Sequence, residues 1–552
     1  MEFVRSAGVL LHVTSLPGRY GIGDLGQPAY KFVDWLVAAG QYWWQILPLG
    51  HPGIDTHHDP YSTQSSWAGS PYLVSLDQLV EAGDLRSRDV TPWRVDDSAR
   101  VDYRAVEASR AELLVLAAQR FFERREKAEM ASFRSFCRKE SWWLEDWALF
   151  SALKQQFGQA PWWLWDQSAA LRDPTVLEEW TRRLEGEIRV HKYIQFRFFE
   201  QWDRLRDYAH RSGVGIIGDL PIYCAHDSQD VWAAREMFKL NPDGTPQAVG
   251  GVPPDFFSDI GQLWGNPVYD WPKNRADGYR WWVSRMRGSL RVADVVRLDH
   301  FRGFEACYEI PGNAKNAVGG KWVPGPGHEF FRVMRRELGS APFIAEDLGF
   351  ITGAVRDLRD SWGLPGMRVL QMGFDCHPSD KLPDGTNPYL PCHHVPHCVV
   401  YPGTHDNNTA VGFYAGLDRE KKRIFREYSG SDGRQPHRTL MRLTYGSVAR
   451  LAVVPVQDVL GLDSRARQNK PGIQRSNIYL WKLVPNQLGS AQAKLVIDLC
   501  RIFERLPERD RKGKLLLIET QEERDRQERG APDRQKRELP IPQRKLKSSQ
   551  QT

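Results

Sequence analysis

Val295-Val-Arg297-Leu-Asp299-His300 is a short apolar run that ends in a carboxylate, and two later runs in the chain end in the same way. These are Phe-Ile-Ala-Glu346-Asp347-Leu-Gly and Val-Val-Tyr-Pro-Gly-Thr-His405-Asp406. In an eight-stranded parallel barrel, the active site lies at the C-terminal ends of the strands, so acids on different strands converge on one pocket. Two such acids can divide the work of glycoside cleavage, one as nucleophile and one as proton donor.

Short apolar runs alternate with amphipathic helical stretches along the body of the chain, which is the pattern of a parallel α/β fold. Helical spacing of apolar residues is clear in Phe330–Leu338 and Thr439–Arg450, each of which precedes an apolar run. Eight such units predict a (β/α)8 TIM barrel. The strands are expected at Val9–Val13, Trp43–Leu47, Val214–Asp219, Ala293–Asp299, Pro342–Glu346, Met367–Phe374, Cys398–Tyr401 and Leu451–Val456.

The interval between the second and third predicted strands, at about residues 74–192, is too long to be an ordinary connection. Its apolar spacing is helical over Arg104–Lys127, Trp143–Phe157 and Val176–Gly186, so we expect a helical insertion on the barrel rim. Charged residues, Gln and Pro dominate residues 507–552, which is typical of a disordered tail. The catalytic barrel is therefore expected to occupy residues 1–506.

The length of 552 residues fits one large barrel with insertions or two domains, and the 41% hydrophobic content is enough to build a large core. The net charge of +6 is a small imbalance between 75 basic and 69 acidic residues, which argues against nucleic-acid binding. The sequence contains no apolar run long enough to span a membrane and no signal-peptide pattern. Together with seven scattered cysteines, typical of reduced proteins, these features predict a cytoplasmic location.

Arg297, Asp299 and Glu346 have the properties of a glycoside-cleaving pair with a supporting cation. Arg297 and Asp299 are two residues apart on one strand, so their side chains point to the same side of the sheet. An arginine beside a carboxylate favours the ionised form that a nucleophile needs. Glu346 ends an apolar run that raises a carboxyl pKa, which suits a proton donor. Each position alone is better explained as a structural ion pair or a helix-cap neighbour, but together with Asp406 they favour a catalytic set.

Four residues carry groups that suit a sugar ligand. His405 and Asp406 offer one donor and one acceptor to neighbouring ring hydroxyls, although a histidine beside a turn acid is also common in loops. Tyr61 and Trp264 lie in stretches rich in Gly, Pro and Ser, which we interpret as loops. Core packing explains most of the 21 tryptophans but explains these two aromatic residues less well, so their flat faces predict sugar-ring contacts.

Two other motifs suggest chemistry that the rest of the sequence does not support. Gly21-Ile-Gly23-Asp-Leu-Gly26 matches a dinucleotide-binding pattern, but Thr14–Tyr20 separates it from the strand and the second strand ends without an acid. Cys392-His393-His394-Val-Pro-His397-Cys398 suggests zinc, but its ligands lack paired spacing and only Cys376-His377 could complete them. We therefore interpret both as loops and expect neither a metal nor a cofactor.

A specific set of motifs occurs between about Gly8 and about Leu506. They are Ser15-Leu-Pro, Asp59-Pro-Tyr61, Ala68-Gly-Ser-Pro-Tyr-Leu73, Gly218-Asp219-Leu-Pro-Ile-Tyr223, Gly251-Val-Pro-Pro-Asp255-Phe-Phe-Ser, Gly261-Gln-Leu-Trp264-Gly-Asn-Pro267, Arg297-Leu-Asp299-His-Phe-Arg-Gly303, Ala345-Glu346-Asp-Leu-Gly349 and Gly403-Thr-His405-Asp406-Asn. Through these motifs the chain closely resembles the 4-alpha-glucanotransferases of the amylomaltase (disproportionating enzyme) family, glycoside hydrolase family 77.

The resemblance implies a TIM barrel without the C-terminal β-sandwich domain of typical α-amylases, and no strand-rich segment follows the eighth predicted strand. It implies Asp299 as the nucleophile, Glu346 as the acid/base and Asp406 as the stabiliser of the transition state. Arg297 and His405 would contact the sugar at the cleavage point. The residues that would border the donor and acceptor grooves are Tyr61, Asp255, Phe256, Ser258, Trp264 and Asn266.

The chain departs from the family pattern at a few places. Asn408 stands where a second Asp usually follows Thr-His-Asp-Asn, and Met372 stands where an aromatic residue is common. Ala466-Arg467-Gln468-Asn469 and Asn477-Ile-Tyr-Leu-Trp481-Lys match the family's Ala-Arg-Met-Asn and Asn-Trp-x-Trp-Arg imperfectly. These differences leave the three acids intact but put the late-loop glucan contacts and the acceptor preference in doubt.

The resemblance implies a glycosyltransferase that moves α-1,4-glucan segments between maltooligosaccharides or starch- or glycogen-type chains. Its double displacement retains configuration, which requires the two carboxyl groups to lie roughly 5–5.5 Å apart. An α-amylase-like hydrolase is the alternative, and it differs in using water as the acceptor. A non-catalytic glucan-binding protein would keep Tyr61 and Trp264 but would need neither Asp299 nor Glu346.

Overall fold

The computed structural model describes residues 2–53, 58–95, 98–254, 259–340, 342–376, 381–382, 385–471 and 478–506, with the backbone of residues 518 and 519. Its centre is an eight-stranded parallel sheet in the order β10-β7-β4-β3-β2-β13-β12-β11. The two ends of this order, β10 and β11, are joined by a hydrogen bond from the backbone N–H of Ala345 to the carbonyl of Pro365 (2.9 Å), which closes the sheet into a barrel. The strands are β2 Ser6–Leu10, β3 Trp43–Gln45, β4 Gly215–Leu220, β7 Val295–Leu298, β10 Phe343–Ala345, β11 Gly366–Val369, β12 Cys398–Tyr401 and β13 Leu451–Pro455.

The eight predicted strands and the (β/α)8 barrel are confirmed, but two strands end three or more residues before their predicted ends, and the first also begins three residues earlier, at Ser6. The first strand ends at Leu10, and the apolar run continues into a 3-10 turn at Val13–Ser15. The sixth strand ends at Val369, and Leu370–Phe374 forms the short helix α14. In both places the turn is as buried as the strand before it, so the apolar pattern does not change where the strand ends.

Alternating side chains of the strands point into the barrel or outward to the surrounding helices, so the inside and the outside of the barrel have separate apolar cores. Val295, Ile344, Val399 and Val453 belong to the cluster inside the barrel, and Phe3 closes its lower end with its ring edge-on to Trp43 (centroids 5.4 Å apart). Their neighbours along the strands point outward to the surrounding helices. Filling the interior with large apolar side chains makes the barrel a packed core, so the site must lie at its rim.

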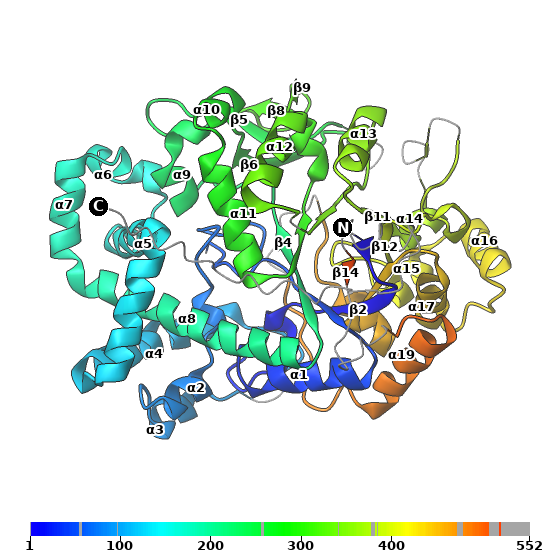
Figure 1. The fold of residues 1–552 in the computed structure, drawn as a ribbon, viewed down its shortest axis with the longest axis horizontal. Coiled ribbons are helices and arrows are strands. Elements are labelled where there is room, and N and C mark those ends of the chain that lie inside the picture. Colours follow the sequence, from blue (N-terminus) through cyan, green and yellow to red (C-terminus); the bar gives the residue numbers. More distant parts are fainter. Residues whose placement is uncertain are drawn as a thin grey trace, which may run out of the picture.

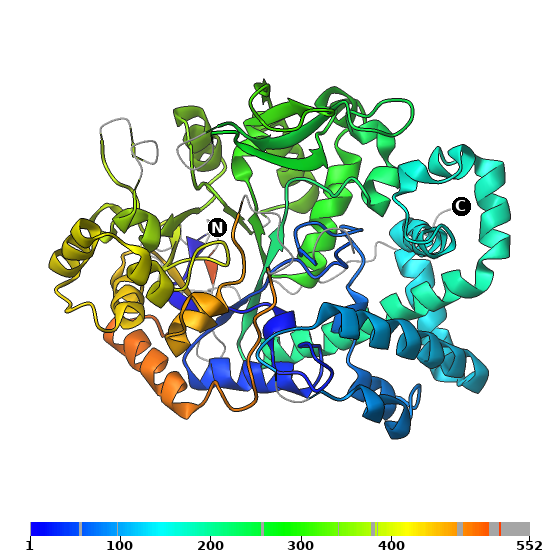
Figure 2. The ribbon, with the colours of Figure 1, turned by 180° about the vertical axis from the view of Figure 1, so that it is seen from behind.

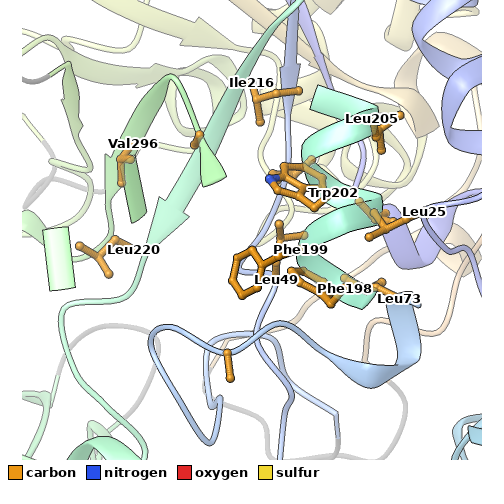
Figure 3. Packing of buried hydrophobic residues seen from close by; sticks show 14 of the residues in the cluster. Leu25, Leu49, Leu73, Phe198, Phe199, Trp202, Leu205, Ile216, Leu220 and Val296 are labelled. Atoms are coloured by element: carbon orange, nitrogen blue, oxygen red, sulfur yellow. The ribbon is translucent and has the colours of Figure 1, made fainter. Parts of the chain in front are cut away.

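Helices surround the barrel and precede or follow each strand (Figures 1 and 2). Trp202 and Leu205 of α8 share one buried cluster with Ile216 of β4, which Figure 3 shows from close by. The helices outside the long insertion are α1 Gln27–Ala38, α9 Gln229–Ala233, α10 Trp271–Ala276, α11 Arg280–Val292, α12 Gly327–Leu338, α13 Gly353–Ser361, α15 Ala410–Gly416, α16 Arg419–Ser429, α17 Pro436–Gly446, α18 Val456–Leu460 and α19 Ser490–Ile502.

Among the described residues, seven α-helices lie between β3 and β4, in the region where the sequence predicts a helical insertion. They form the blue-to-cyan lobe beside the barrel in Figure 1. The buried carboxylate of Asp84 accepts hydrogen bonds from Tyr193 (2.6 Å) and Arg197 (2.8 Å) of α8 and from Arg124 of α4 (2.6 Å), which ties the lobe together. These helices are α2 Leu76–Glu81, α3 Ser87–Val90, α4 Tyr103–Arg124, α5 Lys127–Gln156, α6 Gln167–Ala170, α7 Pro174–Arg183 and α8 Glu185–Arg211. The predicted end of the insertion, near residue 192, falls inside the continuous helix α8.

A second, antiparallel sheet lies over the barrel rim and was not predicted (Figure 2). Its order is β6-β5-β8-β9. The strands are β5 Ala248–Val252, β6 Gln262–Pro267, β8 Ala306–Pro311 and β9 Lys321–Pro324. Trp264, interpreted from the sequence as a loop residue, is therefore a strand residue of β6, and this sheet places it above the barrel.

Most of the predicted tail, 507–552, lies outside the described residues. The backbone of β14 Ile518–Glu519 is described, and it pairs antiparallel with β1 Glu2–Phe3. None of the described helices has the length and apolar character needed to cross a membrane.

Candidate active site

Acidic side chains occupy the C-terminal ends of four barrel strands. In the sheet, Asp219 of β4 pairs with Arg297 of β7, and Leu298 of β7 pairs with Ala345 of β10. Adjacent strands lie about 4.8 Å apart. Asp299 and Glu346 therefore leave neighbouring strands side by side. The acids are Asp219 in β4, Asp299 after β7, Glu346 after β10 and Asp406 after β12.

Arg297 is the central cation of this group. Its side chain is 2% exposed, and its Nη1 lies 2.8 Å from Asp219 Oδ2 and 2.8 Å from Asp299 Oδ1. Val295 of the same strand faces the barrel interior, so the alternation that directs Val295 inward also directs Arg297 and Asp299 to the rim of that interior. The predicted Arg297–Asp299 pair is present, and it orients the Asp299 carboxylate while compensating its charge.

Asp219 is a site residue that the sequence reasoning missed. It accepts hydrogen bonds from Arg297 (2.8 and 2.9 Å) and from the hydroxyl of Tyr61 (2.8 Å). Its motif was noted, but an acid near a strand end does not by itself indicate a partner 78 residues away. Asp219 and Asp299 share the same guanidinium nitrogen, Nη1 of Arg297.

Glu346 is held by backbone donors from two segments. Its Oε2 accepts from the N–H of His300 (2.8 Å), and its Oε1 accepts from the N–H of Leu348 (2.9 Å). Burial raises the pKa of Glu346 well above its usual range, and the charge of Asp299 raises it further against the opposing effect of Arg297. A carboxyl group that keeps its proton near neutral pH is suited to act as a general acid.

His405 and Asp406 form the opposite side of the site. His405 Nε2 lies 3.2 Å from Asp406 Oδ2, and its buried ring stacks on Tyr61 with centroids 5.1 Å apart and an interplanar angle of 10°. Burial lowers the pKa of His405, so the ring is neutral and can donate one hydrogen bond. Tyr61 thus connects Asp219 to the predicted site residue His405, because its hydroxyl binds Asp219 and its ring covers His405.

The divergent stretch after the eighth strand contacts the third acid directly. Asn469 Nδ2 donates to Asp406 Oδ1 (2.6 Å), and Arg467 Nη2 donates to the backbone carbonyl of Asp406 (2.7 Å). Both residues were named from the sequence only as part of an imperfect motif. The structure makes them the groups that orient Asp406.

The other predicted substrate-binding residues have different outcomes. Trp264 lies edge-on to His300, with centroids 4.9 Å apart, close to the loop that holds Glu346. The amide of Asn266 donates to the carbonyl of Cys224 (2.9 Å), so in this structure it supports the loop after β4. Asp255, Phe256 and Ser258 lie outside the described residues.

Asn408 and Met372, two of the departures from the family pattern, make contacts that support the fold. Asn408 donates to Ser464 Oγ (3.0 Å), and its backbone carbonyl accepts from Gln371 (2.7 Å). Met372 packs against the cluster inside the barrel. Within the described residues, neither side chain contacts an acid of the site, so these positions give no structural reason for altered chemistry.

The cysteine and histidine loop at residues 392–398 does not assemble ligands. His394 bonds Ser447 Oγ (2.8 Å) and Cys398 donates to the carbonyl of Val395 (3.0 Å). Within the described part of the chain, no group of three His, Cys, Asp or Glu side chains is arranged to hold a metal ion. His377 lies outside the described residues.

Comparison with known proteins matches this geometry to one family. A model of the 4-alpha-glucanotransferase family matches residues 11–485. The chain belongs to this family. The 4-alpha-glucanotransferase of Synechocystis sp. is 44% identical over 489 residues, which cover 88% of this chain and 95% of the relative. That of Thermus thermophilus is 42% identical over 515 residues, covering 92% and 100%.

A solved structure agrees with the sequence relatives. The amylomaltase from Streptococcus agalactiae, solved in complex with acarbose, is 34% identical and superposes with a TM-score of 0.86 over 91% of this chain and 99% of that chain. The predicted 4-alpha-glucanotransferase family and its barrel are thus confirmed, and membership favours transfer over α-amylase-like hydrolysis.

Proposed function

We propose that Asp299, Glu346 and Asp406 carry out the transfer of α-1,4-glucan segments by a retaining double displacement. The observation that carries this proposal is the pairing of unlike carboxyl groups on adjacent strands. Asp299 is ion-paired with Arg297, whereas Glu346 is buried and has a raised pKa. Two carboxyl groups whose environments differ in this way have the properties of a nucleophile and a general acid.

In the first step, Asp299 attacks the anomeric carbon while Glu346 gives its proton to the glycosidic oxygen. The bond from the anomeric carbon to the leaving segment breaks, and an ester bond to Asp299 forms. Glu346 is then a carboxylate near Arg297, whose charge opposes the rise in its pKa. In the second step, Glu346 accepts the proton of an acceptor hydroxyl, which attacks the same carbon and releases Asp299.

Asp406 and Arg297 support both steps without changing their covalent bonds. Asp406 is fixed by His405, Arg467 and Asn469, so its carboxylate can face the ring hydroxyls and the positive charge that develops on the sugar. The two steps balance without a metal or a cofactor. The substrates are maltooligosaccharides and longer α-1,4-glucans. We further propose a cytoplasmic location, which is consistent with the seven cysteines, none of which forms a disulfide in the described structure.

Maltotriose alone tests the proposed activity. Transfer conserves the number of reducing ends, so we expect glucose and a ladder of longer oligomers while total reducing ends stay nearly constant. Chromatography of the products with a reducing-end assay measures both quantities. Reducing ends that rise steadily with time would instead identify a hydrolase and contradict the proposal.

Trp264→Ala is expected to raise the share of hydrolysis relative to transfer. An oriented sugar hydroxyl competes with concentrated water through its effective molarity, and an aromatic wall holds the sugar in place. Trp264 is packed on His300 beside the acid/base, and Tyr61 and Phe256 are the other predicted walls. The ratio of new reducing ends to transfer products should rise about 3- to 10-fold, equivalent to roughly 1 kcal/mol. Trp322→Ala, on exposed β9, is the matched control and should leave the ratio unchanged.

A further inference from the structure

Tyr479 combines two unfavourable features that the proposed mechanism does not use. Its side chain is 3% exposed, and its hydroxyl has no hydrogen-bond partner in the described part of the structure. Its backbone has φ of +53°, in the left-handed region that residues with a side chain rarely adopt. An unpaired buried hydroxyl and a strained backbone both cost stability, and such costs are concentrated at ligand-binding sites.

The surroundings of this hydroxyl are acidic. Burial holds the pKa of Tyr479 well above its usual value, and the charges of Asp59 and Asp406, followed by those of Asp299 and Asp219, raise it further. The phenol is therefore neutral and keeps its proton. A neutral hydroxyl with no partner among the described residues can donate a hydrogen bond to a ligand and accept another.

Asp59 is the strongest electrostatic neighbour of Tyr479. Its Oδ1 accepts the backbone N–H of Tyr61 (3.0 Å), which shapes the loop that carries the Tyr61 ring. Burial raises the pKa of Asp59 to about 7, with further increases from the charges of Asp406 and Asp299. No step of the reaction described above uses this carboxyl group.

Tyr103 of α4 fixes the two loops relative to each other. Its hydroxyl donates to the backbone carbonyl of Tyr479 (3.2 Å), and its ring stacks on His58 with centroids 4.1 Å apart and an interplanar angle of 7°. The N–H of Tyr479 also donates to the carbonyl of Gln468 (2.7 Å). The backbone of Tyr479 is thus held at its carbonyl by Tyr103 and at its N–H by Gln468. Tyr103 also contacts His58, the residue before Asp59.

Hydrogen bonds place this corner relative to the bond that is cleaved. Tyr479 is hydrogen-bonded to Gln468, and the next residue, Asn469, donates its backbone N–H to the carbonyl of His405 (3.1 Å) and its side-chain amide to Asp406 (2.6 Å). The corner is therefore joined to the Asp406 side of the site, whereas Glu346 is held by the backbone of His300 and Leu348. Because Glu346 must lie beside the leaving oxygen, the corner lies on the other side, toward the sugar that becomes attached to Asp299.

We propose that Tyr479 and Asp59 bind hydroxyl groups of the donor glucan on the glycosyl side of the cleaved bond and contribute to donor affinity. The inference rests on the proposed function, since it needs Asp299 and Glu346 in their assigned roles. A sugar diol can accept from the phenol and donate to the carboxylate, which satisfies the hydroxyl that the free protein leaves unpaired.

Tyr479→Phe tests this role, because it removes only the hydroxyl. With maltotriose as the donor, we expect KM to rise about 3- to 10-fold and kcat to change less than 2-fold, as for the loss of one ligand hydrogen bond. The dissociation constant for acarbose should rise by a similar factor. Tm should not fall, because the hydroxyl has no partner to lose. Tyr72→Phe is the matched control. Its buried hydroxyl also has no partner among the described residues, but the acid that acts on it is Glu107 and not an acid of the site, so KM and Tm should stay unchanged.

Asp59→Asn gives an independent test, since the amide oxygen can still accept the Tyr61 N–H. It should also raise KM, and the effects of the two substitutions should be less than additive if they share one sugar. A wild-type KM in Tyr479→Phe, or a lower Tm, would overturn the inference. If the wild-type protein transfers glucan normally while these outcomes fail, only this inference is wrong. If the wild-type protein performs no transfer, the proposed function itself fails.

Discussion

Replacing Asp299 with Asn is expected to lower the rate of glucan transfer by on the order of 10⁴-fold or more, while the protein stays folded. The substitution removes the nucleophile but keeps its shape. Arg297 retains its ion pair with Asp219, so no buried cation is left uncompensated, and an amide oxygen can still accept from its guanidinium. Product formation from maltotriose and thermal unfolding of the same sample give the two measurements.

Asp219→Asn is the informative comparison for Asp299→Asn. Both positions contact Arg297, but Asp219 also accepts the Tyr61 hydroxyl and is fully buried. We expect Asp219→Asn to lower Tm and to reduce transfer far less than Asp299→Asn. If the two variants lose activity equally, or if Asp299→Asn in a folded sample keeps near-normal activity, Asp299 is not the nucleophile.

The barrel and its main acids could be predicted because their signals are local. Each barrel strand is a short apolar run, and Asp299, Glu346 and Asp406 follow such runs directly. Successive side chains of β7 point alternately into and out of the barrel, so Arg297 and Asp299, two residues apart, point the same way. Where the apolar run passes into a buried turn, after Leu10 and after Val369, the same signal cannot mark the end of a strand.

The second sheet and the supporting contacts could not be predicted because they depend on distant partners. In β5, Gly251 pairs with both Leu263 and Tyr308, and its strand is too rich in glycine to show an apolar pattern. Asp219 acquires its role from Arg297, and Asn469 acquires its role from Asp406, 63 residues earlier in the chain. Such residues become recognisable only when the fold brings their partners together.

Glu346→Gln is expected to lower transfer between natural glucans by about 10²- to 10⁴-fold, the usual contribution of a general acid. The formation of the glycosyl-enzyme from an α-glucosyl fluoride should be affected much less, because fluoride leaves with little protonation.

In the wild-type protein, the raised pKa of Glu346 predicts that the rates with these two substrates depend differently on pH. Glu346 is protonated below this pKa and loses its proton as the pH rises through it. The rate with maltooligosaccharides should therefore fall on the alkaline side, and that of the fluoride's first step should not.

Asp347 supplies the control for this prediction, because it is the next residue but faces away from the reaction. It accepts the N–H of Met367 (2.6 Å) and pairs with Arg359, so it holds β10 to β11 and α13. Asp347→Asn should lower the free energy of unfolding by roughly 1–3 kcal/mol while leaving the ratio of fluoride to maltotriose rates unchanged. In Glu346→Gln that ratio should rise by at least 10-fold with little change in Tm. Equal losses with both substrates would show that Glu346 does not act chiefly as the acid of the first step, and a raised ratio in Asp347→Asn would show that the ratio reports general damage rather than proton transfer.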